Sequence, residues 1–111
     1  MELKELQSNV DFWIKTYGVR YFDEKTNMLL LMEEVGELSR LMARKYGEQS
    51  FKTEISIQEI EENIKEEMGD IIFVLTCLAN QMGIDVEEIM KINLAKKTKR
   101  DSQRHINNPK L

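Results

Sequence analysis

Apolar residues recur at intervals of three and four along most of the chain, which is the period of an α-helix. The first stretch with this spacing contains Leu3, Leu6, Val10, Trp13, Ile14 and Tyr17. It predicts a helix that ends near Gly18, since glycine tolerates the left-handed conformation found at many helix ends. A short aromatic loop over residues 18–23 follows.

Two longer helices are predicted next. The first begins after Asp23, a residue type that caps helix N-termini, and continues to about Tyr46, just before Gly47. Its apolar positions are Met28, Leu31, Val35, Leu38 and Met42. After a polar segment, the next helix is expected from about Ser56 to Met82, with Gly83 as its stop. Its apolar positions are Ile60, Ile64, Ile71, Val74 and Leu78.

A fourth helix is predicted after Asp85, with acidic residues in its first turn and Lys96, Lys97 and Lys99 near its end. From about Asp101 the chain is expected to form a polar tail. No strand-like alternation of polar and apolar residues occurs. The sequence therefore predicts an all-α fold resembling a four-helix bundle, in one domain over residues 1–111 with a polar, disordered tail over residues 102–111.

Length and composition indicate how many domains the chain has and in which compartment it is expected. The length of 111 residues fits a single core, and the one proline, Pro109, lies near the end of the chain, so no interior linker is indicated. The N-terminus lacks the pattern of a secretory signal, and no apolar run approaches the length of a membrane span. The lone Cys77 excludes an internal disulfide. We expect the protein in the cytoplasm.

A short acidic motif occurs twice. The segment Glu33-Glu34-Val35-Gly36-Glu37-Leu38 recurs 33 residues later as Glu66-Glu67-Met68-Gly69-Asp70-Ile71. Acids three residues apart project from one helix face. Four of them, Glu34, Glu37, Glu67 and Asp70, interrupt apolar stripes that are expected to face the core.

Carboxylates that face one another in a partly dry interior need a cation between them. No histidine or cysteine pair accompanies these acids, so the donors are hard oxygens, which favour Mg²⁺ or Mn²⁺ over Zn²⁺. The sequence therefore predicts a metal site. Gly36 and Gly69, which are unfavourable inside helices, would be explained if the two helix backbones approach closely around this site.

The two motifs resemble those of MazG-like nucleotide pyrophosphohydrolases, of the all-α NTP pyrophosphatase superfamily. These enzymes carry E-E-x-x-E, here Glu33, Glu34 and Glu37, and E-x-x-D, here Glu67 and Asp70. The resemblance implies Mg²⁺-dependent cleavage of a nucleoside triphosphate between its α and β phosphates, giving the monophosphate and pyrophosphate. A role in nucleotide-pool house-cleaning is expected. It also implies homodimers, often paired into tetramers, in which a neighbouring subunit supplies part of the base pocket.

A candidate base can be named within these motifs. Glu34 or Glu33 is expected to orient or deprotonate the attacking water. The spacer between the motifs, residues 38–66, is long for the family and predicts a longer hairpin.

Charge is divided unevenly along the chain. The formal net charge of −4 combines −10 over residues 1–90 with +6 over residues 91–111. A basic helix end can complement the helix dipole, bind nucleic acid or bind phosphates. Phosphate binding is favoured for Asn93, Lys97 and Arg100, which share one helix face and resemble the family's downstream nucleotide contacts. Lys96 is a weaker candidate, and Lys25, at the start of the second predicted helix, is another candidate phosphate contact.

Aromatic residues precede the first acidic motif. Tyr21 and Phe22 lie in the loop before the helix that carries it and are candidates for stacking a nucleobase. Ordinary packing is the competing interpretation and is favoured for Trp13. His105 is expected to be inert.

Three other classes of protein share part of this pattern. A ferritin-like di-iron oxidase requires E-x-x-H repeats, and none is present. A helical module that binds nucleic acid or an acidic partner would use the basic end without a metal cluster. A catalytically silent nucleotide-binding protein would keep the fold and lose turnover.

Overall fold

The computed structural model describes all residues from 1 to 111 and contains four α-helices with no strand. They are α1 (Leu3–Tyr17), α2 (Glu24–Tyr46), α3 (Ile57–Gln81) and α4 (Val86–Ile106). The predicted all-α class is confirmed, and three of the four predicted helices match within two residues at both ends. The exception is α4, which continues to Ile106 instead of ending near Asp101. Arg100 and Arg104 both pair with the Asp101 carboxylate there, at 2.9 and 3.1 Å.

Side-chain caps fix the starts of three helices. Asp23 accepts a hydrogen bond from the backbone N–H of Thr26 at 2.7 Å, and Ser56 accepts one from Glu59 at 3.1 Å. Asp85 accepts from the backbone N–H groups of the first turn of α4. These bonds satisfy donors that have no partner inside the helix. The N-cap predicted at Asp23 is confirmed, and Ser56 and Asp85 cap the helices that were predicted to begin beside them.

The left-handed conformation predicted at Gly18, after the first helix, is wrong. Gly18 has φ −90° and is not left-handed; the next residue, Val19, takes the positive φ of 72°. A Cβ on Gly18 would lie 3.1 Å from the carbonyl oxygen of Ile14, so close packing on the helix end favours glycine here. Gly83, after α3, does adopt a left-handed conformation, with φ +66°.

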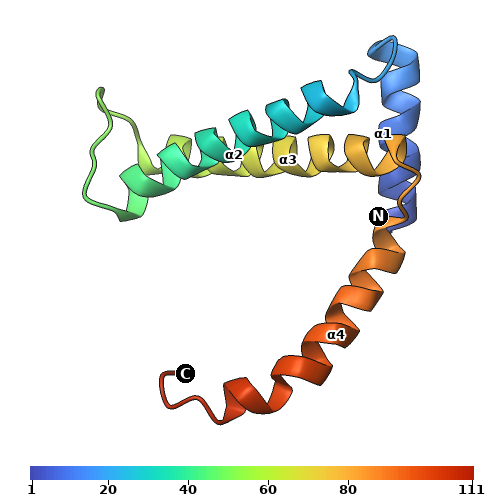
Figure 1. Cartoon of the computed structure of the whole chain (residues 1–111). Helices are drawn as coiled ribbons and strands as arrows, with labels where there is room; N and C mark the ends of the chain where they lie inside the picture. Colours follow the sequence, from blue (N-terminus) through green and yellow to red (C-terminus); the bar gives the residue numbers. More distant parts are fainter.

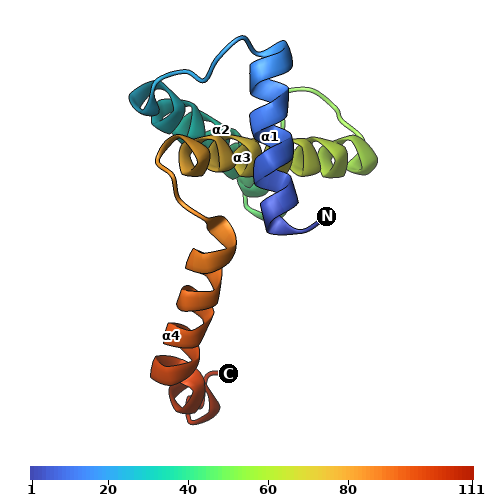
Figure 2. The same ribbon diagram turned by 90° about the vertical axis from the view of Figure 1, so that its right-hand side faces the viewer.

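The centre of the molecule is an antiparallel pair formed by α2 and α3, with α1 lying across one end of it (Figures 1 and 2). Two small apolar clusters hold this arrangement. One joins α1 to α3 through Val10, Ile14 and Cys77. The other joins α2 to the start of α3 through Leu41, Ile60 and Ile64, beside the α2–α3 loop. Both acidic motifs lie between these clusters.

The fourth helix does not complete a bundle within the chain. It packs only near α1 and then projects away from α2 and α3, at 105° to α3 (Figure 1). The left-handed Gly83 lies in the short turn that redirects the chain. Only 12 of 111 residues are buried, so large apolar faces stay uncovered on this helix and on the α2–α3 pair. The bundle-like expectation thus holds for α1 to α3 but not for α4.

No single helix is both long enough and apolar enough to cross a membrane; α3 and α4 meet these criteria only as a bent pair, by length and composition.

The expected close approach of the helix backbones at Gly36 and Gly69 is wrong within the chain. Both glycines are exposed, and a Cβ added to either would meet no atom within 4 Å. Nothing within one chain therefore requires glycine at these two positions.

Two glycine substitutions are expected to have opposite effects on stability. Gly69→Ala should raise the free energy of unfolding by about 1 kcal/mol, because alanine is the better helix former. Gly83→Ala should lower it by about 1–2 kcal/mol, because a Cβ disfavours a positive φ. Urea unfolding followed by circular dichroism at one protein concentration measures both. A destabilised Gly69→Ala variant would contradict the open environment of Gly69 and show that another surface packs there.

Candidate metal centre

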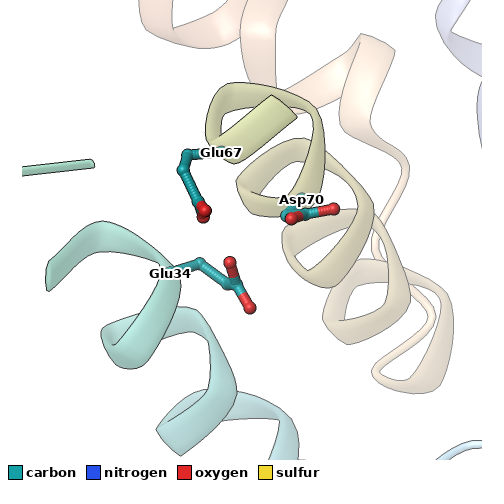
Figure 3. A group of neighbouring side chains, drawn as sticks. All are labelled: Glu34, Glu67 and Asp70. Carbon is teal, nitrogen blue, oxygen red and sulfur yellow. The ribbon is translucent and has the colours of Figure 1, made fainter. Parts of the chain in front are cut away.

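Three carboxylates converge midway along the α2–α3 pair. Glu34 extends from α2 toward Glu67 of α3, and Asp70 lies one turn further along α3 (Figure 3). One carboxylate oxygen from each of the three lies within 4.8 Å of the others. The two acidic motifs, on antiparallel helices, therefore bring acids 33 residues apart in sequence into one site.

These carboxylates lack hydrogen-bond donors. Glu34 Oε2 and Glu67 Oε2 are both buried and have no hydrogen-bond partner. Ionised carboxylates only accept hydrogen bonds, so the facing pair can be satisfied by a shared proton or by a cation. The contact with Glu34, then burial, then the neighbouring Glu37 raise the pKa of Glu67 to about 7.

The two remaining acids of the first motif take different positions. Glu37 is close enough to Glu67 to raise its pKa, although its own side chain is largely exposed and it does not belong to the three-carboxylate group. Glu33 is exposed and lies outside the group. Its predicted role toward water stays a prediction.

The donor set fits a hard divalent cation. All three groups supply oxygen, two of the oxygens are buried without a partner, and the three converge from two helices. Such oxygen-only sites suit Mg²⁺ or Mn²⁺. The thiol of Cys77 is buried in the α1–α3 cluster and takes no part.

Comparisons with known proteins agree with this geometry. The family model of the MazG nucleotide pyrophosphohydrolase domain matches residues 22–105, which include both acidic motifs and most of α4. This chain belongs to the MazG nucleotide pyrophosphohydrolase family. Membership makes it an enzyme of the nucleotide pyrophosphohydrolase class and implies dependence on a divalent metal. The predicted family and the enzyme class are confirmed.

Relatives of this MazG protein are found in bacteria. It is 37% identical to YpjD of Bacillus subtilis over 102 residues, which are 92% of this chain and 88% of YpjD. The crystal structure of YpjD, described as a putative pyrophosphatase, has a TM-score of 0.74 at 36% identity and covers 86% of this chain and 94% of that one. The crystal structure of the Bacillus-conserved MazG protein, described as a nucleotide pyrophosphohydrolase, has a TM-score of 0.73 at 34% identity. The match covers 93% of this chain and 96% of that one. The crystal structure of iMazG from Vibrio DAT 722 has a TM-score of 0.63 at 26% identity, and the match covers 91% of this chain and 99% of that one.

The MazG chain holds a mostly apolar cavity of about 320 Å³ beside the carboxylates. Leu30, one turn before Glu34, contributes to its lining together with Trp13, Tyr21, Phe22 and Phe73. The structure thus places the predicted aromatic residues around one cavity. Trp13 packs edge-on against Phe73, with ring centroids 5.6 Å apart.

The two predicted stacking residues, Tyr21 and Phe22, differ in how firmly their side chains are held in place. The Tyr21 hydroxyl donates to Asp11 at 2.6 Å and accepts from Asn80 at 3.1 Å. Burial and the bond to Asp11 raise the pKa of Tyr21 to about 12, so its hydroxyl stays protonated. Phe22 is exposed on the cavity rim. Only the Tyr21 ring is held in place by bonds of its own side chain.

Asn27 is a cavity residue that sequence reasoning missed. It is only 4% exposed, lines the aromatic cavity and donates from Nδ2 to Gln81 at 2.8 Å. The available signal was its position on α2, seven residues before Glu34 and therefore on the same helix face. A polar residue at a core-facing helix position typically either lines a binding site or forms a buried hydrogen bond that stabilises the fold.

The predicted phosphate contacts are not brought to the carboxylates within one chain. Asn93, Lys96 and Lys97 are exposed on the projecting part of α4 (Figure 2). Arg100, on the same helix, is paired with Asp101. Lys25 lies in the first turn of α2, also exposed and outside the carboxylate group. Their role in phosphate binding stays a prediction.

The raised pKa of Glu67 predicts that the folding stability of the metal-free protein, measured in the presence of a chelator, depends on pH. The folded protein holds this proton up to about pH 7, whereas a glutamate with its usual pKa of 4.5 releases it much earlier. The folded state binds more protons between these values, so stability should fall as pH rises through this window. The melting temperature in EDTA is expected to be lower at about pH 8 than at about pH 5.

Glu67→Gln should flatten this pH dependence, since it removes the titrating group. Glu66→Gln, which changes an exposed neighbour outside the cluster, should keep the wild-type dependence. Melting curves of the three proteins across this pH range provide the measurement. Equal slopes for wild type and Glu67→Gln would show that Glu67 does not hold the proton.

Proposed function

We propose that this enzyme hydrolyses nucleoside triphosphates, ribo- or deoxyribo-, between the α and β phosphates with Mg²⁺ as cofactor. The products are the nucleoside monophosphate and pyrophosphate. The observation that carries the proposal is the pair of buried, unpartnered oxygens on Glu34 and Glu67 beside Asp70. Carboxylates placed this close together favour the binding of a cation between them. Bound cations are also the usual means by which enzymes neutralise the charge of a triphosphate.

The metal ligands in this proposal are Glu34, Glu37, Glu67 and Asp70, and Mn²⁺ can replace Mg²⁺. When bound, the metal supplies neutralisation of phosphate charge and a more acidic water. The protein contributes position: the apolar cluster of Leu41, Ile60 and Ile64 packs α2 against α3 beside the carboxylates, which helps to fix Glu34 opposite Glu67. The exposed Glu33, or Glu34 itself, accepts the proton of the attacking water.

The aromatic cavity is the proposed nucleobase site. It is mostly apolar, borders the carboxylates through Leu30 and contains the held ring of Tyr21. Aromatic rings provide stacking surfaces that every base can use. Asn27 offers an amide oxygen at the cavity wall, which suits a hydrogen bond to a base or sugar donor. We propose nucleotide-pool house-cleaning in the cytoplasm as the role.

A second copy of the chain is proposed to complete the site. The outer surfaces of α2 and α3 carry exposed apolar side chains at helical spacing, Met28, Met32, Val35 and Met42 on α2 and Met68, Ile72, Leu75 and Met82 on α3. We call this the open apolar face. Exposed apolar stripes on a small protein indicate a contact surface. The projecting α4 is then available to a partner's nucleotide, and a homodimer or a dimer of dimers results.

Substitution of a ligand should remove turnover and keep the fold. Glu34→Gln and Asp70→Asn are each expected to lower kcat by at least about 100-fold, since metal-assisted charge stabilisation contributes several kcal/mol. Far-ultraviolet circular dichroism should remain close to wild type. Glu66→Gln, an exposed acid one residue from the cluster, is the matched control and should retain activity.

The assay supplies Mg²⁺ with standard and modified nucleoside triphosphates and quantifies pyrophosphate and orthophosphate separately. Pyrophosphate as the direct product supports the proposed bond cleavage. Orthophosphate as the direct product, or full activity of Glu34→Gln, would contradict it.

The oligomer can be tested through the open apolar face. Leu75 is 53% exposed in the single chain, so Leu75→Glu should fold. If a second copy covers this face, the substitution buries an unpaired charge and should dissociate the assembly. Light scattering after size exclusion should give at least twice the chain mass for wild type and a smaller mass for the variant. Gln58→Glu, on an exposed position at the start of α3, is the control, and a monomeric wild type would contradict the proposal.

A further inference from the structure

A second cavity, of about 380 Å³, lies between α2, α3 and the loop that joins them. Three cationic side chains line it, Arg40 and Arg44 from α2 and Lys52 from the loop. Thr53 and Asn63 add polar groups, and the remaining wall is apolar. The cavity therefore combines positive charge with hydrogen-bond donors in a recess.

These three cations are not neutralised by the protein. None of them forms an ion pair, whereas the adjacent Lys45 pairs with Glu61 at 3.5 Å. Arg44 donates from Nη1 to the backbone carbonyl oxygen of Arg40 at 3.3 Å, which ties its guanidinium to α2. In a chain with a net charge of −4, three unpaired cations around one recess indicate an anionic ligand.

The recess adjoins the carboxylate cluster. Arg40 follows Glu37 by one helical turn, and Asn63 precedes Glu67 by one turn. Because α2 and α3 are antiparallel, both steps lead in the same direction, toward the α2–α3 loop (Figure 1). At 1.5 Å per residue, Arg40 lies about 4.5 Å and Arg44 about 10.5 Å beyond Glu37 along the helix axis.

The aromatic cavity lies on the other side of the carboxylates, bordered by Leu30, one turn before Glu34. Along α2 the order is therefore aromatic cavity, carboxylates, cationic cavity. A nucleoside triphosphate has the same order of chemistry: an aromatic base, an α-phosphate, and the more highly charged β- and γ-phosphates. The spacing of a few ångströms from Glu37 to Arg40 suits adjacent phosphates.

We propose that Arg40, Arg44 and Lys52 bind the β- and γ-phosphates of the substrate and hold them as pyrophosphate when the bond breaks. This rests on the proposed function of the carboxylate site. In the hydrolysis, the water oxygen bonds to the α-phosphorus and the water loses a proton. The bond from the α-phosphorus to the bridging oxygen breaks, and its electron pair remains on pyrophosphate.

The role of the cations in this step is electrostatic. An arginine guanidinium stays protonated in proteins and donates several hydrogen bonds in a fixed plane, so it binds phosphate oxygens without donating a proton to them. Charge that develops on the leaving pyrophosphate is stabilised where it forms. A nucleoside diphosphate leaves part of this recess unfilled, so the site also favours triphosphates over diphosphates.

The test uses inorganic pyrophosphate as the probe, titrated calorimetrically into the full-length protein in Mg²⁺. Arg44→Gln and Lys52→Gln are each expected to weaken pyrophosphate binding by at least about tenfold, the loss of a charged hydrogen bond. Lys65→Gln makes the same charge change at an exposed position of α3 that does not line the recess, and should bind pyrophosphate as wild type does. Circular dichroism verifies folding, and Lys52→Gln, in the loop, covers the case in which Arg44→Gln fails to fold.

Kinetics provide the second measurement. Pyrophosphate should inhibit in competition with the triphosphate, Arg44→Gln should raise KM, and inhibition by the monophosphate should be unchanged. Unaltered pyrophosphate binding by both variants would overturn the inference and leave the proposed hydrolysis intact. Non-competitive inhibition would also overturn it, by showing an anion site off the substrate path. Arginine-dependent pyrophosphate binding without any triphosphate turnover would uphold the recess and reject the proposed function.

Discussion

The structure depends on an opposition of like charges between two helices. Glu34 and Glu67 occupy positions on α2 and α3 where apolar residues would otherwise meet, and each leaves a buried oxygen without a partner. Two carboxylates in such a place repel each other and lose hydration. On one side an apolar cluster packs α2 against α3 despite this cost, and on the other side a second cluster packs α1 against α3. The pair therefore forms a binding site whose most favourable state includes a cation or a shared proton.

The same constraint explains the arrangement around the site. The charged middle of the α2–α3 pair lies between two apolar clusters, one formed by α1 and α3 and the other by α2 and α3 beside the loop that joins them. Each end also holds a cavity, aromatic on one side and cationic on the other. A linear ligand with an apolar and a charged end matches this sequence of environments along α2.

Local chemistry explains why so much of the fold could be predicted. Helix caps such as Asp23 and Ser56 act on backbone groups within three residues, and apolar spacing reports the face of a single helix. The candidate metal site could be predicted from the repeated acidic motif for the same reason, because Glu67 and Asp70 share a helix face wherever their helix lies. The two glycines in the motifs were misinterpreted because their surroundings depend on the angle between helices, which the sequence does not state.

The sequence by itself determined the four helices, apart from the end of α4, and the acids that interrupt their apolar stripes, because these follow from contacts within a few residues. Tertiary structure alone decided that Glu37 lies outside the three-carboxylate group, that α4 leaves the other helices, and that Arg40, Arg44 and Lys52 surround one recess. Residues on different helices and loops come together only through packing across the chain. The direction of α4 in particular follows from the short turn at Gly83, whose left-handed backbone directs this basic helix away from α2 and α3.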